Sequence, residues 1–251
     1  SEEFCRFSEG SSMSRRRIEM LKTLLKYFGY EDDALPLLEN PQQAEYDTSK
    51  CVGCDKCVYV CPYGAIEAEP LATPKIDYEK CTGCGACALV CPHLAMQVKG
   101  FKFERLSHLI QCYGDDVKKL KSQGIAPIIL VFCCQWAEFS ALDTMQDSFL
   151  RKNVALVEIP CFSKLDPINV IQAFRSGFDG VLAMVCLDGD CKSTEGRATA
   201  EENMAALTTT LKRLGIENRF EVYKTSPRNI GGFETKLNSF LAKVAALPKS
   251  K

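Results

Sequence analysis

Cysteine spacing constrains this chain more than any other feature of its sequence. The pattern Cys-x2-Cys-x2-Cys-x3-Cys-Pro occurs twice, starting at Cys51 and again 30 residues later at Cys81. In this arrangement a tight loop presents three thiolates to one inorganic cluster, and the fourth cysteine reaches the other cluster. The repeat therefore predicts a small duplicated unit built around two iron–sulfur clusters.

The crossing arrangement also predicts which cysteines bind each [4Fe–4S] cluster. We expect cluster I to be ligated by Cys51, Cys54, Cys57 and Cys91, and cluster II by Cys81, Cys84, Cys87 and Cys61. A pair of zinc sites is the alternative, because two-residue cysteine spacings also bind Zn²⁺. Zinc sites have no use for the third cysteine or the trailing Cys-Pro, so we favour iron–sulfur clusters.

The rest of the composition limits the cellular setting. Fifteen cysteines would suggest disulfides in a secreted chain. However, the N-terminus has no signal pattern, and no run approaches the roughly 18 apolar residues of a membrane span. With 31 basic and 32 acidic residues, the net charge gives no support for a nucleic-acid or anionic-membrane partner. We expect a cytoplasmic protein with neither kind of partner.

Periodicity divides the chain into four parts. We expect a helical segment and linker over 1–45, an α+β cluster domain over 46–100, a connecting helix over 101–124, and an α/β three-layer domain with a parallel sheet over 125–251. In the last part the expected strands are 128–132, 154–159, 181–185 and 220–223. The expected helices are 137–151, 167–176, 199–214 and 233–245.

A weaker repeat relates the beginning of the chain to its last third. At an offset of 186 residues, Cys5 aligns with Cys191 and Gly29 aligns with Gly215. Two amphipathic helices that end in glycine can also look alike by chance. We expect a truncated copy of the last domain at the N-terminus, and a chain that is a piece of a longer polypeptide.

A second set of cysteines follows the expected parallel strands. Cys133 and Cys134 end the first strand, Cys161 follows the second, and Cys186 ends the third with Cys191 beyond it. Sites in open parallel sheets form at the carboxyl ends of strands, so these thiols are expected to meet. The alternatives are buried cysteines that act as small apolar residues, a thiol or persulfide reductase site, and a docking surface that has lost its metal.

Two family resemblances follow from these motifs. Residues 45–98 resemble the bacterial-type two-cluster ferredoxins at all eight cysteines. Residues 126–245 resemble the delta subunit of the methyl-viologen-reducing hydrogenases, through Phe-Cys-Cys-Gln-Trp at 132–136, Ile-Pro-Cys at 159–161 and Cys-Leu-Asp-Gly-Asp-Cys at 186–191. The combination is also similar to the C-terminal part of the B-type subunit of the quinone-interacting oxidoreductase.

The second resemblance implies one [2Fe–2S] cluster. Its implied ligands are Cys134, Cys161, Cys186 and Cys191. The chain departs from the family pattern at Ala137, where the family has a further cysteine, and at Leu187 and Asp188, where it has a His-Pro pair. These departures place the [2Fe–2S] cluster, rather than the two [4Fe–4S] clusters, in question.

The resemblances imply an electron-transfer component of an anaerobic oxidoreductase complex. Its implied partners are a heterodisulfide-reductase-type flavoprotein and another redox protein, such as a hydrogenase, a formate dehydrogenase or a quinone-linked module. No Gly-x-Gly-x-x-Gly follows a strand, so the sequence gives no fingerprint for a dinucleotide. We therefore expect electron relay without substrate chemistry on this chain, with the thiol or persulfide reductase as the alternative.

Overall fold

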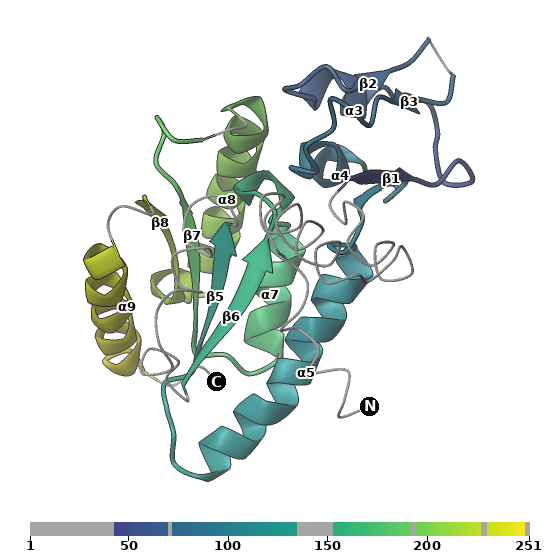
Figure 1. Cartoon of the computed structure of the whole chain (residues 1–251). Helices are drawn as coiled ribbons and strands as arrows, with labels where there is room; N and C mark the ends of the chain where they lie inside the picture. Colours follow the sequence, from purple (N-terminus) through teal and green to yellow (C-terminus); the bar gives the residue numbers. More distant parts are fainter. Residues whose placement is uncertain (1–42, 70–71, 135–152, 192–193, 227–229, 249–251) are drawn as a thin grey trace, which may run out of the picture.

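The structure, a computed structural model, describes residues 43–69, 72–134, 153–191, 194–226 and 230–248 (Figure 1). Several predictions lie outside these residues. They are the N-terminal helix and linker, the copy of the last domain at the N-terminus, the helix over 137–151, and the environment of Ala137.

The cysteine-rich region is small and built from short elements. Strand β1 (Ala44–Tyr46) pairs antiparallel with β4 (Met96–Val98), and β2 (Ile66–Glu67) pairs antiparallel with β3 (Lys75–Ile76). Each half of the repeat contributes one short helix, α3 (Lys56–Val60) or α4 (Ala86–Val90). This is the ferredoxin-type unit that the repeat predicts.

The two halves also share an unusual backbone conformation. Asp55 precedes α3 and Gly85 precedes α4, and both have positive φ angles, 56° and 88°. These positions are equivalent in the 30-residue repeat. A left-handed residue turns the chain sharply into each helix, so that the third cysteine of each motif lies inside the unit.

The rest of the described chain forms a parallel sheet. Its strands are β5 (Ile129–Cys134), β6 (Val154–Ile159), β7 (Gly180–Cys186) and β8 (Phe220–Thr225), in the order β6-β5-β7-β8. All three pairings are parallel. The central strands β5 and β7 are buried along their whole length, because helices cover both faces. The expected parallel sheet is confirmed.

The sheet lies between two layers of helices (Figure 1). Helix α9 (Ile230–Ala245) covers the face that presents Val131 and Met184. Helices α5 (Phe103–Ser122), α7 (Pro167–Arg175) and α8 (Thr194–Arg213) cover the opposite face. Side chains alternate between these two cores along each strand, which fixes the strand register.

Helix α5 joins the two regions and is also part of the second core. Leu106, Ile110 and Val117 are fully buried against the sheet. Gly114 lets α5 approach α7 closely, because a Cβ there would lie 2.9 Å from the Cβ of Ser176. The segment expected as a connection therefore packs along the sheet, and the ferredoxin-type region ends directly before it.

The ferredoxin-type region lies at the carboxyl ends of the strands (Figure 1). There, the short 3-10 helix η5 (Phe162–Lys164) follows β6 and contacts α4 and α8. The Ser163 hydroxyl donates a hydrogen bond of 3.3 Å to the carbonyl of Cys84. Among the described helices, none is both long and apolar enough to cross a membrane.

Candidate iron–sulfur centres

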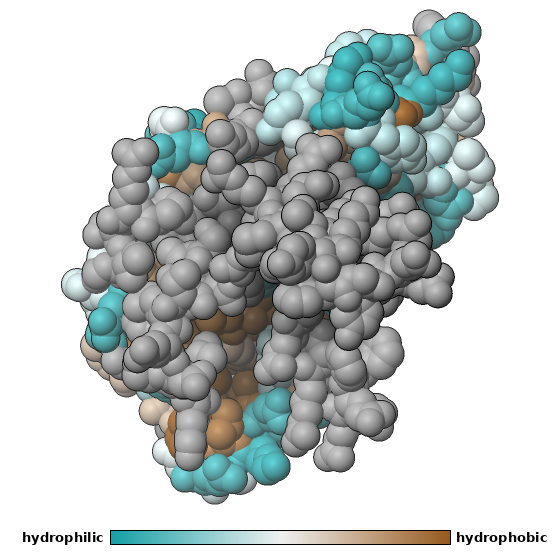
Figure 2. All heavy atoms as spheres, in the orientation of Figure 1, coloured by the Kyte–Doolittle hydropathy of each residue, from teal (hydrophilic) through white to brown (hydrophobic). Residues whose placement is uncertain are grey.

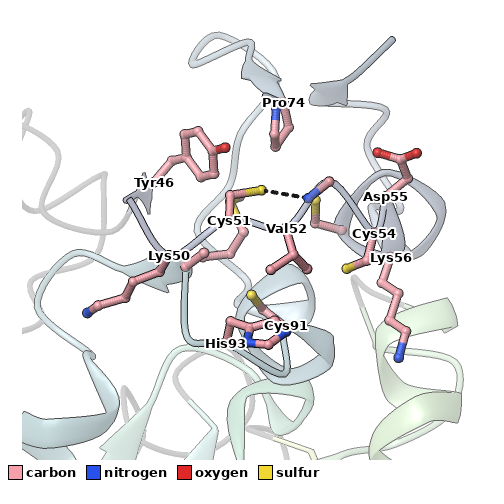
Figure 3. Close-up of a pocket in the computed structure, with 14 residues that line it drawn as sticks. Tyr46, Lys50, Cys51, Val52, Cys54, Asp55, Lys56, Pro74, Cys91 and His93 are labelled. Atoms are coloured by element: carbon pink, nitrogen blue, oxygen red, sulfur yellow. Dashed lines mark hydrogen bonds between the residues drawn. The ribbon is translucent and has the colours of Figure 1, made fainter. Parts of the chain in front are cut away.

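A first cavity lies at the outer side of the ferredoxin-type region. Figure 3 shows it bounded by the loop that begins at Cys51, with the Gly53 amide donating a hydrogen bond of 3.4 Å to the Cys51 sulfur. The cysteines that line it are Cys51, Cys54, Cys57 and Cys91. The first three come from one motif, and the fourth comes from the end of the other.

A second cavity lies on the side nearer the sheet. It shows the same combination in reverse, because three cysteines of the second motif meet the last cysteine of the first. The cysteines that line it are Cys61, Cys81, Cys84 and Cys87. Strand β1 pairs with β4, and β2 pairs with β3, so the two halves of the repeat lie side by side. The fourth cysteine of each motif therefore lies beside the first three cysteines of the other motif.

Backbone amides point at the sulfurs of the second cavity. Ala44 N–H donates to Cys81 at 3.4 Å, and Ala65 N–H donates to Cys61 at 3.3 Å. Such donors favour the charged thiolate, whereas burial favours the neutral thiol. Burial raises the pKa of Cys57 to about 11 and raises the pKa of Cys87 further. Buried thiols of this kind ionise readily only when a metal centre takes the proton's place.

The two cavities differ in their charged surroundings. The first is lined by Lys50, Asp55, Lys56 and His93 in addition to its cysteines. Among the described residues that line the second, Tyr63 is the one ionisable side chain besides the cysteines. Sequence reasoning did not connect His93 with a site, although its position directly after Cys-Pro was a signal that could have done so.

A third group of thiols lies at the carboxyl ends of the parallel strands. Cys134, Cys161 and Cys186 are buried, and the half-buried Cys191 packs against Cys134 and Cys186. The Cys134 and Cys186 sulfurs are 3.6 Å apart. A hydrogen bond with Cys134, together with burial, raises the pKa of Cys161 well above its ordinary value. The structure thus brings together the four cysteines that the family resemblance implied as ligands, whereas Cys133, which the strand-end argument also included, lies on the other face of the sheet.

The remaining described cysteines lie elsewhere. Cys133 points to the opposite face of the sheet, into the core beneath α9. Cys112 lies on α5 with its sulfur 3.8 Å from Nε2 of His108. Both fit the reading of cysteine as a small side chain of a core or helix surface. Cys5 is outside the described residues.

An unsatisfied hydroxyl marks the edge of the third group. Thr225 pairs with Cys186 across β7 and β8, and its side chain is 2% exposed. Within the described part of the chain, its Oγ1 is buried without a hydrogen-bond partner. A buried hydroxyl of this kind costs free energy unless another group accepts from it.

Ion pairs hold the loop between Cys186 and Cys191. Asp188 contacts Arg197 at 3.1 Å and Lys224 at 2.9 Å, and Lys224 also contacts Glu201 at 2.9 Å. Lys224 lowers the pKa of the Asp188 carboxyl. The network occupies the place where the sequence departs from the hydrogenase family pattern, and it ties the loop to α8 and β8.

Among the described residues, no three His, Cys, Asp or Glu side chains are arranged to hold a single metal ion. This result does not conflict with clusters, because the four thiolates of a [4Fe–4S] cluster bind four different irons rather than one point. The 3.6 Å between Cys134 and Cys186 is close to the edge of a tetrahedron with metal–sulfur bonds of about 2.3 Å, which is roughly 3.8 Å.

Comparison with known families agrees with this division. Residues 50–95 match the model of the 4Fe-4S dicluster domain. Residues 129–248 match that of the methyl-viologen-reducing hydrogenase delta subunit. The two matches cover the ferredoxin-type region and the parallel sheet respectively.

Curated relatives are of two kinds. The chain is 33% identical over 205 residues to the A-type subunit of the ferredoxin/F(420)H(2)-dependent CoB-CoM heterodisulfide reductase of Methanosarcina acetivorans, covering 80% of this chain and 25% of the relative. It is 33% identical over 180 residues to the A-type subunit of the ferredoxin:CoB-CoM heterodisulfide reductase of Methanosarcina mazei, covering 71% of this chain and 22% of the relative. The chain thus spans about a quarter of the length of these relatives.

The second kind of relative matches a smaller share of this chain and a larger share of its own length. The chain is 32% identical over 99 residues to the D-type iron-sulfur subunit of the F420-non-reducing hydrogenase of Archaeoglobus profundus, covering 38% of this chain and 72% of the relative. The family model that matches residues 129–248 and this relative both describe subunits of hydrogenases. The chain belongs to the family of the methyl-viologen-reducing hydrogenase delta subunit, joined here to a 4Fe-4S dicluster domain.

Proposed function

We propose that this chain is an electron relay with three iron–sulfur centres in a row. Two [4Fe–4S] clusters and one [2Fe–2S] cluster would supply one-electron redox chemistry. Their proposed ligands are Cys51, Cys54, Cys57 and Cys91 for the first, Cys61, Cys81, Cys84 and Cys87 for the second, and Cys134, Cys161, Cys186 and Cys191 for the third. The observation that carries the proposal is the gathering of these thiols in three groups of four.

The second and third groups are neighbours across the junction between the regions. Cys161 directly precedes η5, and the next residue but one, Ser163, hydrogen-bonds the Cys84 carbonyl. Tyr63 lies in the same place, since the thiols of Cys84, Cys161 and Cys191 add to burial in raising its pKa. This short, water-poor junction supports electron transfer between the second and third centres.

The first cavity supports exchange with a partner. Cys54 is exposed, and the nearby Val52 and Tyr59 are 57% and 86% exposed. Figure 2 shows that the surrounding surface, at the upper right, is otherwise mainly hydrophilic. Exposed apolar side chains beside a redox centre suit a transient contact with another protein. We propose that one redox partner docks here.

The relatives suggest the kind of complex. Those that match most of this chain are named as subunits of heterodisulfide reductases, and those that match less than half of it are named as hydrogenase subunits. We propose that the chain passes electrons between a flavoprotein of heterodisulfide-reductase type and a second redox protein. On this proposal it is part of a hetero-oligomeric assembly and transforms no substrate itself.

A thiol or persulfide reductase is the second candidate, favoured by the 3.6 Å contact between Cys134 and Cys186. Against it, both thiols are buried, and the raised pKa of Cys161 disfavours the thiolate that such chemistry requires. We therefore place the relay first.

Iron and acid-labile sulfide analysis after anaerobic purification tests the relay. The proposal requires about ten irons per chain and EPR signals from two kinds of reduced cluster. About eight irons, with no [2Fe–2S] signal, would remove the third centre. If Cys134→Ser instead leaves iron content unchanged and abolishes a disulfide- or persulfide-reducing activity, the thiol candidate replaces the relay.

A further inference from the structure

One buried cation lies at the junction and belongs to none of the three cysteine groups. Lys164, the last residue of η5, is 3% exposed. Lysine is almost never fully buried unless something balances its charge. In the described part of the chain, no ion pair includes Lys164. Its balancing charge therefore has to come from somewhere other than a paired carboxylate.

The side chain of Lys164 packs directly against the second cysteine loop. A Cβ on Gly85 would lie 2.9 Å from both Cβ and Cδ of Lys164, and Gly85 has a φ of +88°. Only a glycine fits both this backbone conformation and this contact. Gly85 separates Cys84 from Ala86 and Cys87, so the lysine stem lies against the loop that lines the second cavity.

The charged neighbours of Lys164 are few. Asp166 and Glu104 are the carboxylates that act on it, and Cys87 acts on it as a thiolate would. Burial lowers its pKa, and these negative charges oppose that effect. A cluster with four thiolate ligands carries net negative charge in both oxidation states, and more when reduced. Such a centre would provide the missing counter-charge.

We propose that the buried ammonium of Lys164 makes the centre in the second cavity easier to reduce than the centre in the first. This inference rests on the proposed function, because it assumes a [4Fe–4S] cluster in each cavity. One electron enters the cluster from a one-electron donor, and no bond or proton changes place. The fixed ammonium stabilises the added negative charge, and it does so strongly because the junction excludes water.

Among the described residues that line the first cavity, no lysine is buried. Its lysines, Lys50 and Lys56, are exposed, and Lys50 already pairs with Asp47 at 3.4 Å. Charges in contact with water are screened and change a potential little. The two cavities have equivalent cysteines, so the buried lysine is the difference that raises the reduction potential of the second centre. Electron transfer from the outer centre toward the junction is then favourable.

The test is an EPR-monitored redox titration of the full chain and of Lys164→Met, which keeps the aliphatic stem and removes the charge. At a fixed ambient potential, the reduced-to-oxidised ratio of the second-cavity cluster should fall at least tenfold, equivalent to about 59 mV for one electron. A Cys51→Ala background, which leaves three thiols in the first cavity and four in the second, identifies the signal of the second-cavity cluster. Lys56→Met is the matched control and should shift the first-cavity cluster less than threefold.

Each result has a distinct meaning. If the wild-type chain shows no EPR signals from two [4Fe–4S] clusters, the proposed function itself is wrong. Normal iron content in Lys164→Met with an unshifted ratio overturns the role of the lysine while leaving the relay intact. Lys164→Arg keeps the charge and should show the wild-type reduced-to-oxidised ratio of the second-cavity cluster. A lowered ratio in this variant at full iron content also contradicts the role of Lys164. If Lys164→Met loses iron, Lys164→Gln in the same titration serves in its place.

Discussion

The two cavities of the ferredoxin-type region are copies in sequence but not in surroundings. Each takes three cysteines from one motif and one from the other. The first opens beside exposed Cys54 and charged side chains, whereas the second lies against η5 of the sheet region. A duplication supplies two equivalent ligand sets, and docking of a second region makes them different. We expect that difference to set the direction of electron flow.

The largest effect should come from removing a cysteine in each cavity. Cys54→Ser and Cys87→Ser should each reduce iron content by about four atoms per chain. Cys87 is buried in α4, which contacts η5 and α8, so its loss should also lower the thermal midpoint of the sheet region. Iron analysis and thermal unfolding followed by circular dichroism measure both effects. Equal losses of thermal stability in the two variants would contradict an asymmetric junction.

A smaller effect should follow from adding one methyl group at the junction. Gly85→Ala meets both a positive φ and a contact of 2.9 Å with Lys164, and we expect a loss of about 3 kcal/mol in unfolding free energy. Gly64→Ala is the matched control, because Gly64 also has a positive φ, 56°, but nothing lies within 4 Å of the added Cβ. Its cost should be about 1 kcal/mol. Denaturant unfolding of both variants gives the comparison, and similar costs would argue against close packing at the junction.

The third cysteine group offers a comparison between the iron-free and iron-loaded chain. Thr225→Val removes a buried hydroxyl that has no partner among the described residues. In iron-free protein the variant should be as stable as wild type or more stable by about 1 kcal/mol. In loaded protein it should be less stable, because the hydroxyl then donates to the bound centre.

Thermal unfolding of both forms measures this reversal of sign. Thr225→Ser keeps the hydroxyl and should behave like wild type in both. If Thr225→Val has the same effect with and without iron, the hydroxyl does not face the centre.

The smallest effect concerns pH at the loop that carries Cys191. Because Lys224 lowers the pKa of Asp188 in the folded chain, this carboxylate stabilises the fold at pH values above its ordinary pKa of 3.8. The contribution is lost as pH falls through the lower folded value. Asp188→Asn should therefore lower the thermal unfolding midpoint slightly near neutral pH, and the difference from wild type should disappear as the pH falls below the folded pKa of Asp188.

Asp190→Asn is the control for this prediction. Asp190 is exposed in the same loop, and in the described part of the chain it takes part in no ion pair. An equal effect of the two substitutions would show that net charge, rather than the network around Asp188, protects the loop.

Much of the fold follows from local pattern. The strand of residues 154–159 has the predicted limits, and the other three begin or end within two residues of them. Helix α8 begins five residues before its predicted start, at Thr194, because polar Thr and Glu residues in its first turns hide the helical period. Apolar runs predict the strands well, because the central strands β5 and β7 are buried along their whole length.

The sequence by itself determined the two cysteine motifs, the parallel strands and the edge at which the second thiol set gathers. These depend on spacing within a loop or on the common direction of parallel strands, and both are written in neighbouring residues. Only the tertiary structure decided that Lys164 lies against Gly85, that the Thr225 hydroxyl beside Cys186 has no partner among the described residues, and that α5 is part of the sheet's core. These contacts join segments far apart in the chain, and packing between two folded regions, rather than any local pattern, selects them.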